Sequence, residues 1–143
     1  KVGSTHDEVK VVDDQIGTPT YTFDLARLLV DMIETDKYGY YHATNSELPA
    51  TESGYDENGT KTGYISWYDF TKEIYRQAGY DTKVTPVTTA EYGLSKAVRP
   101  FNSRLDKSKL VENGFKPLPV WPDAVKRYLE ILKKQSFFDK LGK

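Results

Sequence analysis

Cysteine is absent from the 143 residues of the chain, and histidine occurs only at His6 and His42. Disulfide bonds, thiolate catalysis, Cys-ligated zinc and iron–sulfur clusters all need cysteine, so the composition excludes them. Two histidines this far apart in the sequence also exclude a His-rich metal site. Most enzyme classes whose metal can be recognised from a sequence are therefore ruled out.

A long apolar run and an excess of charge of one sign are also missing. The longest apolar runs, such as Leu28-Leu29-Val30, are far below the ~18 residues that a membrane span needs, and no signal peptide opens the chain. With 20 basic and 21 acidic residues the formal net charge is -1, which gives no strong field to attract nucleic acid or an anionic membrane. We therefore expect a cytoplasmic globular protein without nucleic-acid or membrane partners.

Hydrophobic periodicity and turn residues predict an α/β chain with short strands and three main helices. The strands are expected at 9–12, 40–43 and 84–87. The helices are expected at 23–34, at 66–79 and from 122 past 132. Pro86 cannot donate a backbone hydrogen bond, so the third strand should lie at the edge or end of a sheet. Ser66 and Asp69 form a helix-capping pattern, and Gly79 ends the same helix.

Each predicted helix has an apolar face that should contact the core. In the first helix the expected core residues are Leu25, Leu28, Leu29, Met32 and Ile33. In the second they are Trp67, Phe70, Ile74 and Tyr75. In the third they are Ala124, Val125, Tyr128, Leu129 and Leu132.

The expected domain organisation is simple. Residues 9–134 form one domain, and its polar stretch 45–63, with a likely turn at 56–59, is expected to be a mobile surface insertion. Residues 1–8 are expected to be a remnant of a preceding helix or an appended sequence. Residues 135–143 are expected to form a C-terminal tail.

The spacing Tyr-x-x-x-Lys, in which a lysine lowers the pKa of a catalytic tyrosine, occurs at Tyr68–Lys72 and Tyr92–Lys96. With 11 tyrosines and many lysines in the chain, about one such pair is expected by chance. No Gly-rich dinucleotide-binding loop accompanies either pair. We therefore expect neither pair to be catalytic.

The polar cluster at 99–104 offers a different chemistry. The guanidinium of Arg99 is a planar fork suited to phosphate oxygens, and Asn102 and Ser103 add neutral donors beside it. The alternative is a solvated loop with an ordinary surface arginine. Spacing alone does not decide between these two interpretations.

Four segments of the chain, at 9–26, 39–45, 65–74 and 99–106, occur in the order found in a known family. The stretch Asp-Gln-x-Gly-x-Pro-Thr at 14–20 is the most specific, and Ser-Trp-Tyr-Asp-Phe at 66–70 and Arg-Pro-Phe-Asn-Ser-Arg-Leu-Asp at 99–106 follow it. Together they resemble the C-terminal half of the dTDP-4-dehydrorhamnose reductase family. The resemblance implies the C-terminal portion of an extended short-chain dehydrogenase with a Rossmann-like α/β fold.

The resemblance implies that the parent protein has an N-terminal Rossmann half, which binds NADPH or NADH. The C-terminal half closes over the dTDP-sugar, and dTDP-4-dehydro-L-rhamnose is reduced to dTDP-L-rhamnose. The family's Gly-rich loop, its catalytic Tyr-x-x-x-Lys and its Ser/Thr partner all lie in the N-terminal half. We expect this chain to begin after them, to need that half as a partner, and to be inactive alone, with no catalytic or cofactor-binding residue of its own.

The resemblance also gives candidate substrate-binding residues. The loop at 13–22, with a backbone fixed by Gly17 and Pro19, is expected to face the substrate cleft and to present Gln15, Thr20 and Tyr21. Arg99, with Asn102 and Ser103, is expected to lie on the cleft wall and to help hold the nucleotide diphosphate or order the loop that holds it. The alternatives are that the loop only starts the next helix, and that Arg99 pairs with an acid or with backbone carbonyls.

The resemblance also implies that some family members form dimers linked by magnesium. Their metal ligands are one glutamate in the helix after the Pro-Thr motif and another in the last helix. The aligned positions here hold Phe23 and Ile131, which cannot bind a hard cation, so a magnesium site is not expected. The oligomeric state stays open. Two other functions also stay open: a non-catalytic regulatory or scaffold subunit similar to the β subunit of methionine adenosyltransferase, and an independently evolved binding module.

Overall fold

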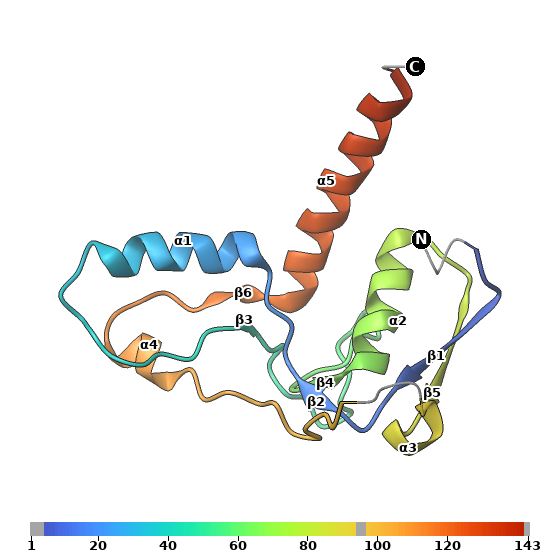
Figure 1. Cartoon of the computed structure of the whole chain (residues 1–143), viewed down its shortest axis with the longest axis horizontal. Helices are drawn as coiled ribbons and strands as arrows, with labels where there is room; N and C mark the ends of the chain where they lie inside the picture. Colours follow the sequence, from blue (N-terminus) through green and yellow to red (C-terminus); the bar gives the residue numbers. More distant parts are fainter. Residues whose placement is uncertain (1–4, 94–96, 142–143) are drawn as a thin grey trace.

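A computed structural model of the chain describes residues 5–93 and 97–141, with side chains described as far as residue 135 (Figure 1). The first elements in chain order are β1 (Glu8–Val12), β2 (Ile16–Gly17), α1 (Thr22–Ile33), β3 (Asn45–Ser46), β4 (Ile65–Ser66) and α2 (Trp67–Ala78). They are followed by β5 (Lys83–Val87), α3 (Thr89–Tyr92), α4 (Ser108–Glu112), β6 (Leu118–Val120) and α5 (Trp121–Leu141). The mixed α/β class and the three long helices agree with the prediction.

The described strands form three two-stranded sheets: parallel β1–β5, antiparallel β2–β4 and parallel β3–β6. Figure 1 shows α1, β3, β6 and α4 at one end of the molecule and β1, β5 and α3 at the other, with β2 and β4 between them. The predicted strands at 9–12 and 84–87 are therefore confirmed. Pro86 lies opposite Val11, and among the described residues β5 pairs with β1 alone, as expected for an edge strand.

The prediction of a strand at 40–43 is wrong. These residues form no strand, and the side chain of Tyr40 is 96% exposed. The pairing instead starts at Asn45, which lies opposite Leu118 of β6. The aromatic residues Tyr40 and Tyr41 favour a strand, but a strand also needs a neighbouring backbone to pair with, which 40–43 lacks.

Helix α1 is confirmed, but its predicted core face is too wide. Leu28 is buried in a cluster with Leu110, Phe115 and Leu118, and Leu25 and Met32 pack against that cluster. Leu29 and Ile33, in contrast, are 51% and 80% exposed. Adjacent helix positions differ by about 100°, so both residues point away from the one side of α1 that is covered.

Helix α2 has the predicted ends. Ser66 Oγ accepts a hydrogen bond from Asp69 N, the Asp69 carboxylate accepts one from Ser66 N, and Gly79 follows with a φ of 73°. Phe70 and Ile74 pack on the cluster of Ile65, Trp121 and Val125, and Tyr75 is half-buried. The predicted burial of Trp67 is wrong, since its side chain is 55% exposed.

Helix α5 begins at Trp121, with Pro122 in its first turn as the sequence suggests. Trp121, Ala124 and Val125 are buried, and Leu129 packs beside them. Tyr128 and Leu132 were expected in the core but are 49% and 40% exposed. Figure 1 gives the reason, because the C-terminal part of α5 extends beyond the other elements and nothing covers it. No helix in the described part of the chain is long and apolar enough to cross a membrane.

A buried ion pair joins α1 to α5. Arg127 donates to both oxygens of Asp24, at 2.7 Å each, and Asn45 Nδ2 donates to the same carboxylate at 2.8 Å and to Pro119 O at 3.0 Å. The hydrogen bonds from Arg127 lower the pKa of Asp24 and outweigh its desolvation. One carboxylate therefore ties together α1, β3, β6 and α5.

The stretch 45–63 is only in part a surface segment. The predicted turn is present, with Gly59 N donating to Asp56 O at 3.0 Å. Thr60 and Thr62 are nevertheless buried, and Thr60 Oγ1 donates to the carboxylate of Glu73, the one fully buried residue of α2. This contact fixes the stretch against α2, which a purely surface insertion would not need.

Candidate functional site

A cleft of about 740 Å³ opens between β1, the loop 15–19, the start of α2, the short helix α3 and the segment 99–103. Two charged side chains, Lys10 and Arg99, line it, and no carboxylate does so among the described residues. We call this cavity the cationic cleft. Its lining favours a ligand that carries negative charge.

The loop 15–19 is held from both sides. Ile16 and Gly17 pair with Ser66 and Ile65 in β2–β4. On the opposite side Ile16 N donates to Phe101 O and Ser103 N donates to Ile16 O, each at 2.8 Å. A Cβ at Gly17 would lie 3.4 Å from Ser103 Cβ, which places the loop in van der Waals range of Ser103. The loop therefore brings the 99–103 segment beside the start of α2.

Gln15 lines the cationic cleft, as expected. Its Nε2 donates to Thr89 Oγ1 at 3.0 Å, and Thr89 Oγ1 donates to Asp14 Oδ1 at 2.6 Å. The hydrogen bond from the Thr89 hydroxyl and a second one from Thr89 N lower the pKa of Asp14. Asp14 thus anchors α3 and fixes the amide of Gln15 at the cleft wall.

Thr20 and Tyr21 do not line this cleft. Thr20 is exposed, and Tyr21 N donates to Asn45 Oδ1 at 2.6 Å. The Tyr21 ring lies 6.1 Å from that of Tyr128, and the Arg127 guanidinium lies over it at 5.4 Å. Two of the three side chains expected from this loop are therefore absent from the cleft lining, and Tyr21 lies toward α5 instead.

Arg99 and Ser103 line the cationic cleft, and Asn102 does not. The side chain of Asn102 holds Arg104 instead, since its Oδ1 accepts from Arg104 N at 3.1 Å and from Arg104 Nε at 2.9 Å. Arg99 is exposed, and within the described ranges it makes no hydrogen bond or ion pair. The expected pairing of Arg99 with an acid or a carbonyl is therefore not found there.

Trp67 also lines the cationic cleft, which the sequence did not predict. Its spacing from Phe70 and Ile74 matches a core-facing stripe, but Trp67 is the first residue of α2 and lies at the end of that stripe. The covering elements do not reach this first turn. No sequence signal distinguishes such a residue from a core residue.

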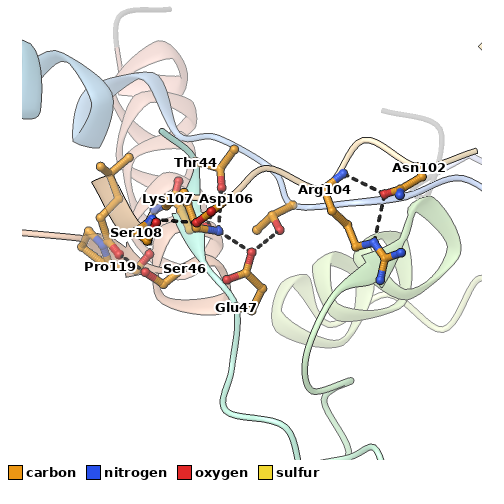
Figure 2. Close-up of polar contacts among 12 residues, drawn as sticks. Thr44, Ser46, Glu47, Asn102, Arg104, Asp106, Lys107, Ser108 and Pro119 are labelled. Carbon is orange, nitrogen blue, oxygen red and sulfur yellow. Dashed lines mark hydrogen bonds and ion pairs between the residues drawn. The ribbon is translucent and has the colours of Figure 1, made fainter. Parts of the chain in front are cut away.

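A second cavity, of about 410 Å³, is lined by Lys107, Arg104 and Asp106 among others, and we call it the Lys107 cavity. Figure 2 shows these three side chains and their polar contacts. Lys107 Nζ forms an ion pair with Glu47 and donates to Thr44 Oγ1 at 3.1 Å. Desolvation raises the pKa of Glu47, but hydrogen bonds from Lys107 and Thr18 outweigh it and hold that pKa below 4.5. The charge of Lys107 is therefore neutralised by the fold.

The first Tyr-x-x-x-Lys pair, Tyr68–Lys72, shows no catalytic arrangement. Lys72 Nζ lies 5.3 Å from the centre of the Tyr68 ring, and Tyr68 is not part of the lining of the cationic cleft. Tyr92 does line the cleft, whereas Lys96 lies outside the described residues. The geometry of the second pair is therefore not defined.

The described residues do not fit the metal or the dinucleotide of the resemblance. Phe23 and Ile131, which the resemblance aligns with the magnesium ligands of some family members, are 56% and 44% exposed and have no side-chain oxygen to bind a hard cation. The long helices begin after Tyr21, Ser66 and Val120, and none of these follows the Gly-rich loop that a dinucleotide diphosphate needs. Neither group is assigned a position in the described part of this chain.

Known proteins are similar to this chain in both sequence and fold. Residues 1–134 match the family model described as the RmlD substrate binding domain. The spore coat polysaccharide biosynthesis protein SpsK of Bacillus subtilis is 36% identical over 130 residues, which cover 91% of this chain and 39% of that protein.

Two solved dTDP-4-dehydrorhamnose reductases have the same architecture. The Clostridium acetobutylicum enzyme is 39% identical with a TM-score of 0.77, covering 92% of this chain and 41% of that one. The Bacillus anthracis enzyme, solved in complex with NADP, is 34% identical with a TM-score of 0.75, covering 90% and 40%. The chain thus spans about 40% of the length of its relatives. It belongs to the RmlD substrate binding domain family.

Proposed function

We propose that this chain supplies the substrate-binding part of a dTDP-4-dehydrorhamnose reductase, which reduces dTDP-4-dehydro-L-rhamnose to dTDP-L-rhamnose. The observation that carries the proposal is the cationic cleft, whose charged lining consists of Lys10 and Arg99 without a described carboxylate. A dTDP-sugar carries a diphosphate, and a planar guanidinium binds phosphate oxygens through two parallel hydrogen bonds. Membership in the substrate binding domain family supports the same conclusion.

The proposed roles follow from the position of each side chain. Arg99 has no partner within the described ranges, so its fork is free to bind the diphosphate. Gln15 and Ser103 add neutral polar groups to the same wall, and the Thr89–Asp14 contact holds Gln15 in place. Substrate contact by Thr20, Tyr21 and Asn102 stays a prediction, because these side chains do not line the cleft.

The nicotinamide cofactor supplies the hydride when it is bound. We assign NADPH or NADH to the part of such a reductase that this chain does not match, because no long helix in the described part of the chain follows a Gly-rich loop. The Bacillus anthracis relative was solved with NADP. That part is then the partner of this chain, and the substrate lies between the two. The proposal includes the cytoplasmic location expected from the sequence.

A chimera tests this proposal. In it the chain replaces the matching 41% of the Clostridium acetobutylicum reductase, and NADPH oxidation is followed with dTDP-4-dehydro-L-rhamnose. We expect reductase activity in the chimera and none in the 143-residue chain alone. A folded chimera that binds NADPH but neither binds dTDP nor reduces the sugar would contradict the proposal and favour a regulatory or scaffold role.

A further inference from the structure

We propose that Trp67 is the surface on which the thymine ring of the substrate stacks, while Arg99 holds the diphosphate. This inference rests on the proposed function and adds the recognition of the base. It starts from a contrast between the two tryptophans of the chain. Trp121 is fully buried, whereas Trp67 is 55% exposed and lines the cationic cleft.

The exposed indole of Trp67 is held in place by ring contacts that lead to the core. The rings of Trp67 and Phe70 lie 6.2 Å apart at 64°, and those of Phe70 and Trp121 lie 5.8 Å apart at 70°. Both are edge-to-face contacts, which aromatic pairs favour. Since Trp121 is part of the core cluster, this series of rings fixes the indole to the core while more than half of its side chain stays accessible.

The surroundings of Trp67 match a nucleotide in both charge and shape. Ligand-binding clefts are lined mainly by apolar and aromatic side chains, with a few polar groups that fix the orientation of the ligand. The cleft also carries Lys10 and Arg99, whose charges suit phosphates rather than a neutral sugar. A planar base stacks on an aromatic side chain, and a diphosphate pairs with a guanidinium, so one ligand uses both features. Because a pyranose ring can also lie on an indole, the test includes a sugar.

Fluorescence of the 143-residue chain tests the inference, because neutral acrylamide reaches Trp67 but not buried Trp121. We expect dTDP and thymidine to protect Trp67 from quenching, whereas inorganic pyrophosphate and methyl α-L-rhamnoside do not. Trp67→Ala should weaken dTDP binding by about fivefold or more, the range measured for base stacking on aromatic side chains. Trp67→Phe should retain most of the affinity, since the ring is kept.

A matched control is Tyr40→Ala, which removes an exposed aromatic ring outside the cleft and should leave dTDP affinity unchanged. If wild-type chain binds dTDP and Trp67→Ala binds it equally well, the inference is wrong and the proposed function stands. Protection by the rhamnoside but not by thymidine would also overturn it, because the indole would then hold the sugar. If wild-type chain does not bind dTDP, the proposed function fails and the stacking role fails with it.

Discussion

The cationic cleft and the Lys107 cavity are lined by the neighbouring residues Ser103 and Arg104, yet Arg99 in the first and Lys107 in the second differ in how their charge is paired. In the Lys107 cavity the ammonium of Lys107 pairs with Glu47, and both side chains are at least four-fifths buried. In the cationic cleft Arg99 is exposed and has no partner within the described ranges. A cation that the fold already neutralises stabilises the fold, whereas an unpaired cation in a cleft is available to a ligand.

Arg127 should give the largest loss of stability, since its partner Asp24 is more deeply buried than Glu47, the partner of Lys107. Arg127→Ala leaves the carboxylate of Asp24, whose side chain is 4% exposed, without its main partner. Breaking a buried ion pair from one side costs about 3 kcal/mol or more of unfolding free energy. Urea denaturation measures this loss. A change below about 1 kcal/mol, the range of surface pairs, would show that Asp24 does not depend on Arg127.

Lys107→Ala should lower the unfolding free energy by about 2 kcal/mol, because it leaves the partly buried Glu47 unpaired. Adding Glu47→Ala should recover part of this loss, since the unpaired carboxylate is then removed as well. The double-mutant cycle is measured by urea denaturation. Additive losses from the two substitutions would contradict a coupling between Lys107 and Glu47.

Low pH should weaken the ion pair between Lys107 and Glu47. Folding lowers the pKa of Glu47 below the ordinary glutamate value of 4.5. The ionised carboxylate therefore contributes stability that is fully present above pH 4.5 and is lost as the pH falls through the lowered pKa of the folded state. Wild-type stability should therefore decrease as the pH falls below 4.5, and Lys107→Ala should show a smaller decrease. Unfolding free energies measured between neutral pH and pH 3 give both slopes. Equal slopes would contradict the assignment.

The parts of the fold that could be predicted are those fixed by neighbours in the sequence. The cap of α2 needs only Ser66 and Asp69, and its end needs only Gly79, so both boundaries follow from the sequence. Thr88 and Glu91 form the same kind of capping box at α3. That signal was available in the sequence and was missed.

The parts that failed depend on contacts between distant segments. Asn45 lies in β3 because residues of β6, more than 70 positions away, provide its partner strand. Ile33 is exposed because its side of α1 has nothing packed against it, which helical spacing does not reveal. Helical periodicity shows that a helix has an apolar face, but not how much of that face another element covers.

The candidate site also has features that local sequence predicts and features that depend on distant contacts. The local stiffness of the loop with Gly17 and Pro19 correctly suggested a fixed backbone, and Gln15 lies on the cleft wall. The loop then turns at Tyr21 toward Asn45 and α5, which no local pattern indicates. Asn102 likewise looked like a phosphate ligand beside Arg99, but it holds Arg104.

The most direct test of the account compares Arg99→Ala and Lys107→Ala in the same two measurements, dTDP affinity by calorimetry and melting temperature. Losing a charged hydrogen bond to phosphate should weaken dTDP binding about tenfold in Arg99→Ala, with an unchanged melting temperature. Lys107→Ala should melt at a lower temperature and bind dTDP like wild type below that temperature. The reverse pattern, a less stable Arg99→Ala with normal affinity, would show that the unpaired arginine belongs to the fold and that the cationic cleft is not the nucleotide site.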